Sequence, residues 1–303
     1  MDFKVIFSLI SICFIWGYLW VVIKLGLQTF PPLLFSALRL IFGSIVLLLV
    51  LIVLKKSILP KNSEWIHLVI LSIMMCVGYY GISTVGMQYV SSGIASILVY
   101  TMPIIIGFLG HYFLEEKLTS QKIVGLFIGA IGLLSIIWPE VKTLHWDLSL
   151  VGNLLMIISA TFWAISIIYI KKIFSDYEKI KLTFWQMFVG GLILLVISIF
   201  VEKAAGIQWN TPKNIFYLFY SSVLGTALAF VCWNWILSKI DASVASMSIM
   251  SVPLLGLLFG HFILNEPLHS TTLLGTFLIC IGISLHSVEI KKLQQYFKNT
   301  PTI

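Results

Sequence analysis

One charged residue lies well inside an apolar stretch of this chain. Arg39 falls about a third of the way into the apolar run near residues 33–54, roughly 10 Å from the end of a helix that rises about 1.5 Å per residue. A charge in such a place is costly and usually faces a bundle interior or a water-filled cavity. Two roles are open: a cation that meets a carboxylate or other anionic group of a solute, or a structural arginine bonded to carbonyls at the ends of neighbouring helices.

Aromatic and amide side chains in other apolar runs could line a cavity. Trp16 and Trp163 fall mid-run, and the amides of Gln186 and Asn234 need hydrogen-bond partners, so they are expected to face inward. Aromatic walls with a few fixed polar atoms suit small amphipathic solutes; lipid contact or helix packing is the alternative for each residue alone. The predicted solute-binding residues are Arg39, Trp16, Trp163, Tyr80, Tyr100, Gln186, Trp233 and Asn234, within a wider set that adds Trp20, Tyr79, Tyr169, Trp185 and Trp235.

Two prolines are expected in the middle of helices. Pro103 and Pro253 each remove a backbone hydrogen bond and free a carbonyl, which an apolar medium tolerates only where protein or a cavity satisfies it. They are predicted to be bending points for gating, with a static kink as the alternative.

The sequence lacks the residue patterns that a metal site, an ATP-driven pump or a membrane-embedded enzyme would need. His111 with Glu115, and His261 with Asn265, are spaced four apart without a third ligand, so we predict no metal and no cofactor. The phosphate-binding pattern G-x-x-x-x-G-K-[ST] does not occur, which argues against an ATP-driven pump. A membrane-embedded enzyme would need His, Asp, Glu or Cys clustered at one depth, and the sequence predicts no such cluster.

Composition indicates the medium in which these residues act. The chain has 303 residues, of which 59% are hydrophobic and only 10% charged, with a mean hydropathy of +1.04. Soluble proteins carry about 25% charged residues, so we predict an all-α integral membrane protein. Helices long enough to span a bilayer are expected near residues 5–26, 33–54, 66–87, 93–114, 121–138, 148–170, 181–201, 215–237, 243–264 and 271–288.

The lysines predict the direction of these helices. Alternate loops, beginning at the N-terminus, hold fourteen lysines, whereas the other loops hold four. Such a bias favours cytoplasmic loops, so both termini are predicted to be cytoplasmic. Basic residues spread over short loops account for the net charge of +7 without a nucleic-acid partner.

The chain also contains an internal duplication. Residues 91–132 match residues 241–282 without a gap, and FSALRLIFG (35–43) meets LTFWQMFVG (182–190), which sets Arg39 against Gln186. Because five helices is an odd number, the two halves are predicted to run in opposite orientations. Inverted repeats are typical of secondary transporters that bind solutes near the membrane midplane.

These residues resemble a known family. WGYLWVVIK (16–24), ALRLIFG (37–43) and P-x6-GH-x4-E-x-L (103–118) are similar to the drug/metabolite transporter superfamily, and the duplication favours its EamA branch. The resemblance implies a ten-helix inverted-repeat bundle that moves small metabolites. On this basis residues 1–138 and 148–288 are expected to be the two EamA-like repeats, followed by a basic cytoplasmic tail at 289–303.

The predicted function is alternating-access export of small metabolites, such as amino acids, across a bacterial plasma membrane. All acidic residues fall in loops or at helix ends, and arginine does not release its proton at accessible pH, so facilitated or exchange transport is expected. The partners are then the solute and the lipid bilayer. Multidrug efflux is the main alternative, although a permanent cation would need a counter-charge; a channel and an enzyme are less favoured.

Overall fold

The computed structural model describes residues 3–115, 119–143, 148–203, 207, 211–242, 245, 249 and 251–287. Within these residues all regular secondary structure is helical, as the sequence predicted. Seven helical stretches are long and apolar enough to cross a membrane. They are α1 (Phe3–Gly26), α2 (Pro32–Val53), Asn62–Gly86, Ser92–Leu114, α8 (Leu148–Ile173), α9 (Lys179–Val201) and Pro212–Leu237.

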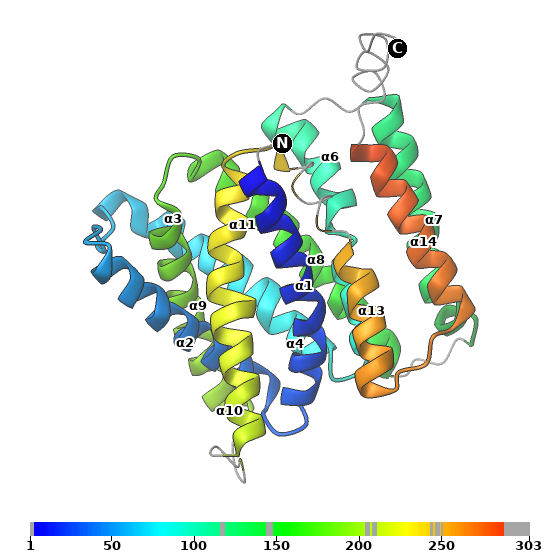
Figure 1. The fold of residues 1–303 in the computed structure, drawn as a ribbon, viewed down its shortest axis with the longest axis horizontal. Coiled ribbons are helices and arrows are strands. Elements are labelled where there is room, and N and C mark those ends of the chain that lie inside the picture. Colours follow the sequence, from blue (N-terminus) through cyan, green and yellow to red (C-terminus); the bar gives the residue numbers. More distant parts are fainter. Residues whose placement is uncertain are drawn as a thin grey trace.

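Three further helices contain shorter apolar stretches: α7 (Ser120–Thr143), α13 (Ser251–Leu264) and α14 (Ser270–Ser287). Figure 1 shows α7 and α14 side by side along one edge of the bundle, with α2 and α9 at the opposite edge and α1 between them. Large apolar side chains cover the outer faces, including Phe200, which is 84% exposed. An apolar exterior of this extent fits contact with lipid.

Two of the long stretches contain a π-helical segment in the middle. In Asn62–Gly86, η2 (Ile73–Gly81) follows α3 (Trp65–Ser72) and precedes α4 (Ile82–Gly86). In Pro212–Leu237, η3 (Tyr220–Leu228) lies between α10 (Pro212–Phe219) and α11 (Ala229–Leu237). The two π segments are separated by 147 positions, the offset at which Arg39 meets Gln186. Such segments are rare and often occur at functional sites.

The span predicted near residues 93–114 is present as Ser92–Leu114, but it is interrupted. The stretch is divided into α5 (Ser92–Val99) and α6 (Met102–Leu114), with a turn at Tyr100 and Thr101. Pro103 therefore lies in the first turn of α6 and not mid-helix, where its missing N–H is one of the groups that a helix start leaves unpaired anyway. Pro253 likewise lies in the first turn of the described helix α13.

Carboxylates of the second half of the chain hold helix starts of the first half. The Glu266 side chain accepts hydrogen bonds from the backbone N–H groups of Ser92 and Gly93, at 2.7 and 3.0 Å, and from the Ser92 hydroxyl. Glu202 in the same way accepts from the N–H groups of Leu33 and Leu34. These acceptors satisfy donors that a helix N-terminus cannot pair internally, so Glu266 has the structural role expected for a helix-end carboxylate.

Two lysines donate hydrogen bonds to backbone carbonyls just beyond the C-terminal ends of α4 and α11. Lys24 donates to the carbonyls of Met87 and Val90, at 2.8 and 2.6 Å. Lys171, 147 positions after Lys24, donates to the carbonyl of Ile240 at 2.7 Å. A cation at helix-end carbonyls satisfies acceptors and complements the helix dipole.

We expect Glu115→Asn to stabilise the protein. Glu115 ends α6 with a φ of 58°, and Asn265 ends α13 with a φ of 54°. The left-handed conformation costs most residues about 1–2 kcal/mol, and asparagine tolerates it better than glutamate. The substitution should therefore add up to about 1 kcal/mol to the free energy of unfolding. The reciprocal Asn265→Glu variant should lose a similar amount. Thermal unfolding in detergent measures both, and equal stability of the two variants contradicts the prediction.

Candidate functional site

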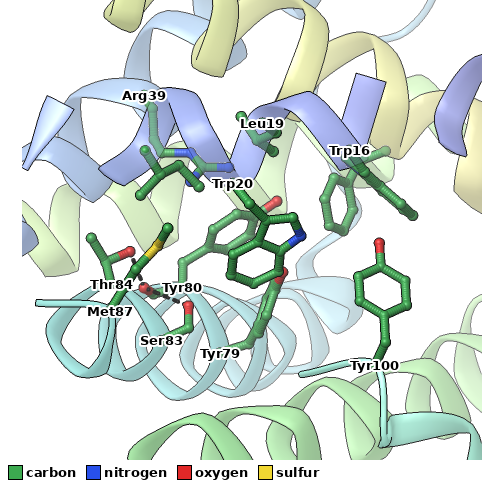
Figure 2. Close-up of a pocket in the computed structure, with 12 residues that line it drawn as sticks. Trp16, Leu19, Trp20, Arg39, Tyr79, Tyr80, Ser83, Thr84, Met87 and Tyr100 are labelled. Carbon is green, nitrogen blue, oxygen red and sulfur yellow. Dashed lines mark hydrogen bonds between the residues drawn. The ribbon is translucent and has the colours of Figure 1, made fainter. Parts of the chain in front are cut away.

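A cavity lies between α1, α2 and the π segment η2 (Figure 2). It encloses about 20 Å³, which is room for about one water molecule. Its lining residues are Trp16, Leu19, Trp20, Ile23, Arg39, Tyr79, Tyr80, Ser83, Thr84, Met87, Tyr100 and Phe230. A metabolite does not fit into this volume, so the cavity is closed in this conformation and must widen to admit one.

Arg39 lies at one end of the cavity, with only 2% of its surface exposed. Its Nε and Nη2 donate to the Thr226 hydroxyl at 3.2 and 3.1 Å, and its guanidinium lies 4.9 Å from the centre of the Tyr80 ring. No carboxylate of the described residues pairs with it. A guanidinium has five N–H donors, so Arg39 is a buried cation with donors to spare and no anionic partner in the part of the chain that the structure describes.

In each π segment, a backbone carbonyl accepts hydrogen bonds from side chains. In η2 the Tyr80 carbonyl accepts from the side chains of Ser83 and Thr84, at 3.2 and 2.7 Å (Figure 2). In η3 the Gly225 carbonyl accepts from the Trp16 indole at 3.0 Å. The wider turn of a π-helix changes which carbonyls are paired inside the helix, and here side chains bond two of them.

Aromatic rings fill the space beyond Arg39. Trp16 has ring centroids 5.7 Å from those of Trp163 and Trp233. Tyr79 stacks on Trp163 at 4.7 Å, and Tyr100 meets the same indole edge-on at 5.7 Å. These separations are those of favourable aromatic pairs. The cluster joins α1, η2, α8, α11 and the turn at Tyr100, so a movement of any of these elements changes the shape of the cavity.

Several buried polar atoms near this cluster have no hydrogen-bond partner among the described residues. They are Oη of Tyr80, Nε1 of Trp163, Nε1 of Trp233, both amide atoms of Gln186, and Oδ1 of Asn234. Buried polar groups are nearly always paired, and an unpaired one is expensive in a membrane interior. Each of the five side chains was predicted to bind solute, and each is at least 98% buried.

The predicted site residues divide into two groups. Arg39, Trp16, Tyr80 and Tyr100 line the cavity, and Trp163 and Trp233 pack against Trp16. The amides of Gln186 and Asn234 lie apart from it, on α9 and α11.

Three aromatic residues of the wider set lie elsewhere. Tyr169 contacts His67, the Trp185 indole donates to the Ile58 carbonyl, and Trp235 lines an outer groove. Thr226 and Phe230 also contribute to the site, although neither was among the predicted residues. The duplication could have indicated Thr226, because it lies 147 positions after Tyr79.

Comparison with known proteins adds independent information. The profile of the EamA-like transporter family matches residues 3–138 and 150–288. The chain is 38% identical over 289 residues to the uncharacterized transporter YoaV of Bacillus subtilis, covering 95% of this chain and 98% of YoaV. It is 26% identical to a chloroplastic WAT1-related protein of Arabidopsis thaliana, covering 91% of this chain and 68% of that protein. A solved crystal structure shares the fold with a TM-score of 0.73, at 15% identity over 93% of this chain and 97% of that one.

Proposed function

The chain belongs to the EamA-like transporter family, and from this premise we propose that it carries small carboxylate-bearing metabolites, such as amino acids, through the Arg39 cavity by alternating access. The family and the seven apolar spans make it a multi-pass membrane protein, and its bacterial relatives place it in the plasma membrane. The buried, unpaired charge of Arg39 in a closed aromatic cavity is the observation that carries the proposal.

The proposed topology is ten crossings in two inverted halves with both termini in the cytoplasm. Support comes from the matching π segments η2 and η3 and from the matching lysines Lys24 and Lys171 at helix ends. The pairing of α2 with α9 adds to it, because Glu202 at the end of α9 holds the start of α2, so these two equivalent helices run antiparallel. Inverted repeats place a solute site at their interface, and the Arg39 cavity borders the second half of the chain through Phe230 and Thr226.

A closed cavity fits one step of alternating access. Arg39 would bind the solute carboxylate with donors that Thr226 leaves free, while the aromatic rings hold apolar parts of the solute. The interrupted stretch α5–α6 carries Tyr100 at its turn, so a tilt of α6 relative to α5 would move Tyr100 and open the cavity. In this proposal Pro103 and Pro253 take part in gating by starting rigid helices after a turn.

The test is counterflow in proteoliposomes without an ion gradient. Vesicles are loaded with unlabelled amino acids, nucleobases or cationic dyes, and entry of labelled tracer is measured with and without an imposed pH gradient. We expect exchange of carboxylate-bearing solutes with no pH gradient, since no acidic side chain was predicted within a span to relay protons. Exchange of cationic or neutral compounds alone would favour multidrug efflux, and a strict need for the pH gradient would contradict facilitated transport.

A further inference from the structure

A groove on the outer surface lies between the start of α1, the start of α9 and the end of α11. Its volume is about 540 Å³, against about 20 Å³ for the Arg39 cavity, and different residues line the two. Figure 1 shows the start of α1 next to the end of α11, at one face of the bundle. The groove is therefore separate from the solute cavity, and its size suits part of an organic ligand.

The groove has apolar walls. Phe3 and Phe7 line it from α1, with ring centroids 6.5 Å apart, and they are 77% and 63% exposed. Val231 and Trp235 line it from α11, one turn apart. Val231 lies six residues before the end of α11 at Leu237, which is roughly 9 Å at 1.5 Å per residue. Apolar side chains thus extend from the helix ends to about this depth, as an acyl chain would require.

The charged side chains of the groove lie where helices begin or end. Lys4 is in the first turn of α1, Lys179 begins α9, and Lys56 follows α2. Glu178 is the one carboxylate among the described lining residues. Its Oε1 accepts from Lys56 at 2.7 Å, and its Oε2 accepts from the N–H of Lys181 at 2.6 Å. Three positive charges therefore meet one negative charge whose two oxygens are both already bound.

Lys179 keeps a donor for a ligand. Its Nζ donates to the carbonyls of Phe174 and Ser175, at 3.0 and 2.6 Å, and an ammonium has three N–H groups. The third N–H, together with the net positive charge of the groove, favours an anionic group at the helix ends. In the proposed topology this face is cytoplasmic, where anionic lipids make the membrane surface negative.

We propose that this groove binds one anionic phospholipid of the cytoplasmic leaflet. Lys4 and Lys179 bind the phosphate, with Lys56 beside it, and an acyl chain lies along Phe7 and Trp235. A soluble anion would leave the apolar walls uncovered, and a neutral lipid would leave the net charge unpaired. A second copy that placed the same groove against this one would bring like charges together. The lipid site goes beyond the transport function proposed above and does not depend on which solute is carried.

The test measures quenching of the Trp235 indole by lipids with brominated acyl chains. The full-length protein is reconstituted in phosphatidylcholine vesicles that contain increasing fractions of brominated phosphatidylglycerol or brominated phosphatidylcholine. The contribution of Trp235 is the difference between wild type and Trp235→Phe. We expect half-maximal quenching at an about 25-fold lower fraction of the anionic lipid, because each of the two net positive charges gives a preference of about fivefold.

Variants of the lysines assign this preference to the groove. Lys4→Gln and Lys179→Gln should each lower it about fivefold, and the double variant should remove it. Lys61→Gln is the matched control, because Lys61 is exposed on the loop after α2 and does not line the groove, so the preference should persist. Lys179 also bonds two carbonyls, so Lys4→Gln alone decides the question if variants of Lys179 do not fold.

Three results would overturn the inference. Equal half-quenching fractions for the two lipids mean that the groove holds surrounding lipid without selection. A preference that Lys4→Gln and the double variant leave unchanged, or that Lys61→Gln lowers as much, assigns the effect to the overall charge of this face. Absence of quenching of Trp235 by either lipid means that something other than lipid, such as a second copy of the chain, covers the groove.

Discussion

Substitution of Arg39 by glutamine is expected to lower kcat/KM for exchange of carboxylate-bearing solutes by about 100-fold or more. Hydrogen bonds to charged groups contribute about 1.5–3 kcal/mol each, and two such bonds from a guanidinium fork to a carboxylate amount to about 3 kcal/mol, or about two powers of ten. Arg39 is 2% exposed, so water cannot replace the lost donors. Counterflow rates in proteoliposomes, measured over a range of solute concentrations, check this.

Two further variants distinguish binding from architecture. Arg39→Lys keeps the charge but loses the planar fork and the contact with the Tyr80 ring, so an intermediate rate is expected. Thr226→Val removes the acceptor for Nε and Nη2 and leaves the guanidinium in place. If Arg39 only holds η3 against α2, then Thr226→Val and Arg39→Gln should be equally damaging. If Arg39 binds solute, Thr226→Val should retain carboxylate exchange, and near-wild-type exchange by Arg39→Gln would refute the binding role.

Several features of the site could be predicted because polarity is scarce in this chain. In an apolar helix, one charge or one amide must face inward, so Arg39 and Gln186 could be assigned to the interior without coordinates. Trp163 lies 147 positions after Trp16, the offset of the duplication in this part of the chain, and their rings lie 5.7 Å apart. These side chains lie in the interior because they are buried, and composition and spacing along the chain predict which residues are buried.

The remaining features depend on the hydrogen-bond pattern of the backbone, which an apolar sequence does not display. The run that contains Tyr79 and Tyr80 is apolar on every face, so its sequence does not distinguish a π-helical segment from an α-helical one. The same holds for the turn at Tyr100, which makes Pro103 a helix-start residue. The position of Trp185 away from the Arg39 cavity could not be predicted for a related reason. Its indole donates to a loop carbonyl at Ile58. When a helix is apolar on every face, the sequence does not predict which face is turned toward the interior of the bundle.

Gly282→Ala is expected to destabilise the protein by disrupting the contact between α7 and α14. A Cβ added at Gly282 would lie 2.5 Å from the Gly125 carbonyl oxygen and 2.5 Å from the Gly129 nitrogen. Gly132 makes the matching contact in the other direction, 2.6 Å from the Gly275 carbonyl oxygen. The atoms that the added Cβ would meet belong to the backbone and cannot rotate aside as a side chain can, so α7 and α14 must move apart. Small residues that let helices approach closely are typical of membrane interfaces.

Overpacking of this kind costs about 1–3 kcal/mol and acts against the roughly 1 kcal/mol by which alanine favours a helix over glycine. Gly129→Ala is the matched control, because its Cβ would meet only the end of the Ile104 side chain, at 3.1 Å, so it should be neutral or stabilising. The thermal unfolding temperature in detergent should therefore fall for Gly282→Ala and stay unchanged or rise for Gly129→Ala. If Gly282→Ala instead changes the oligomeric state with no loss of stability, these glycines serve an interface between copies of the chain, and the close approach of α7 to α14 is not what holds this edge of the bundle together.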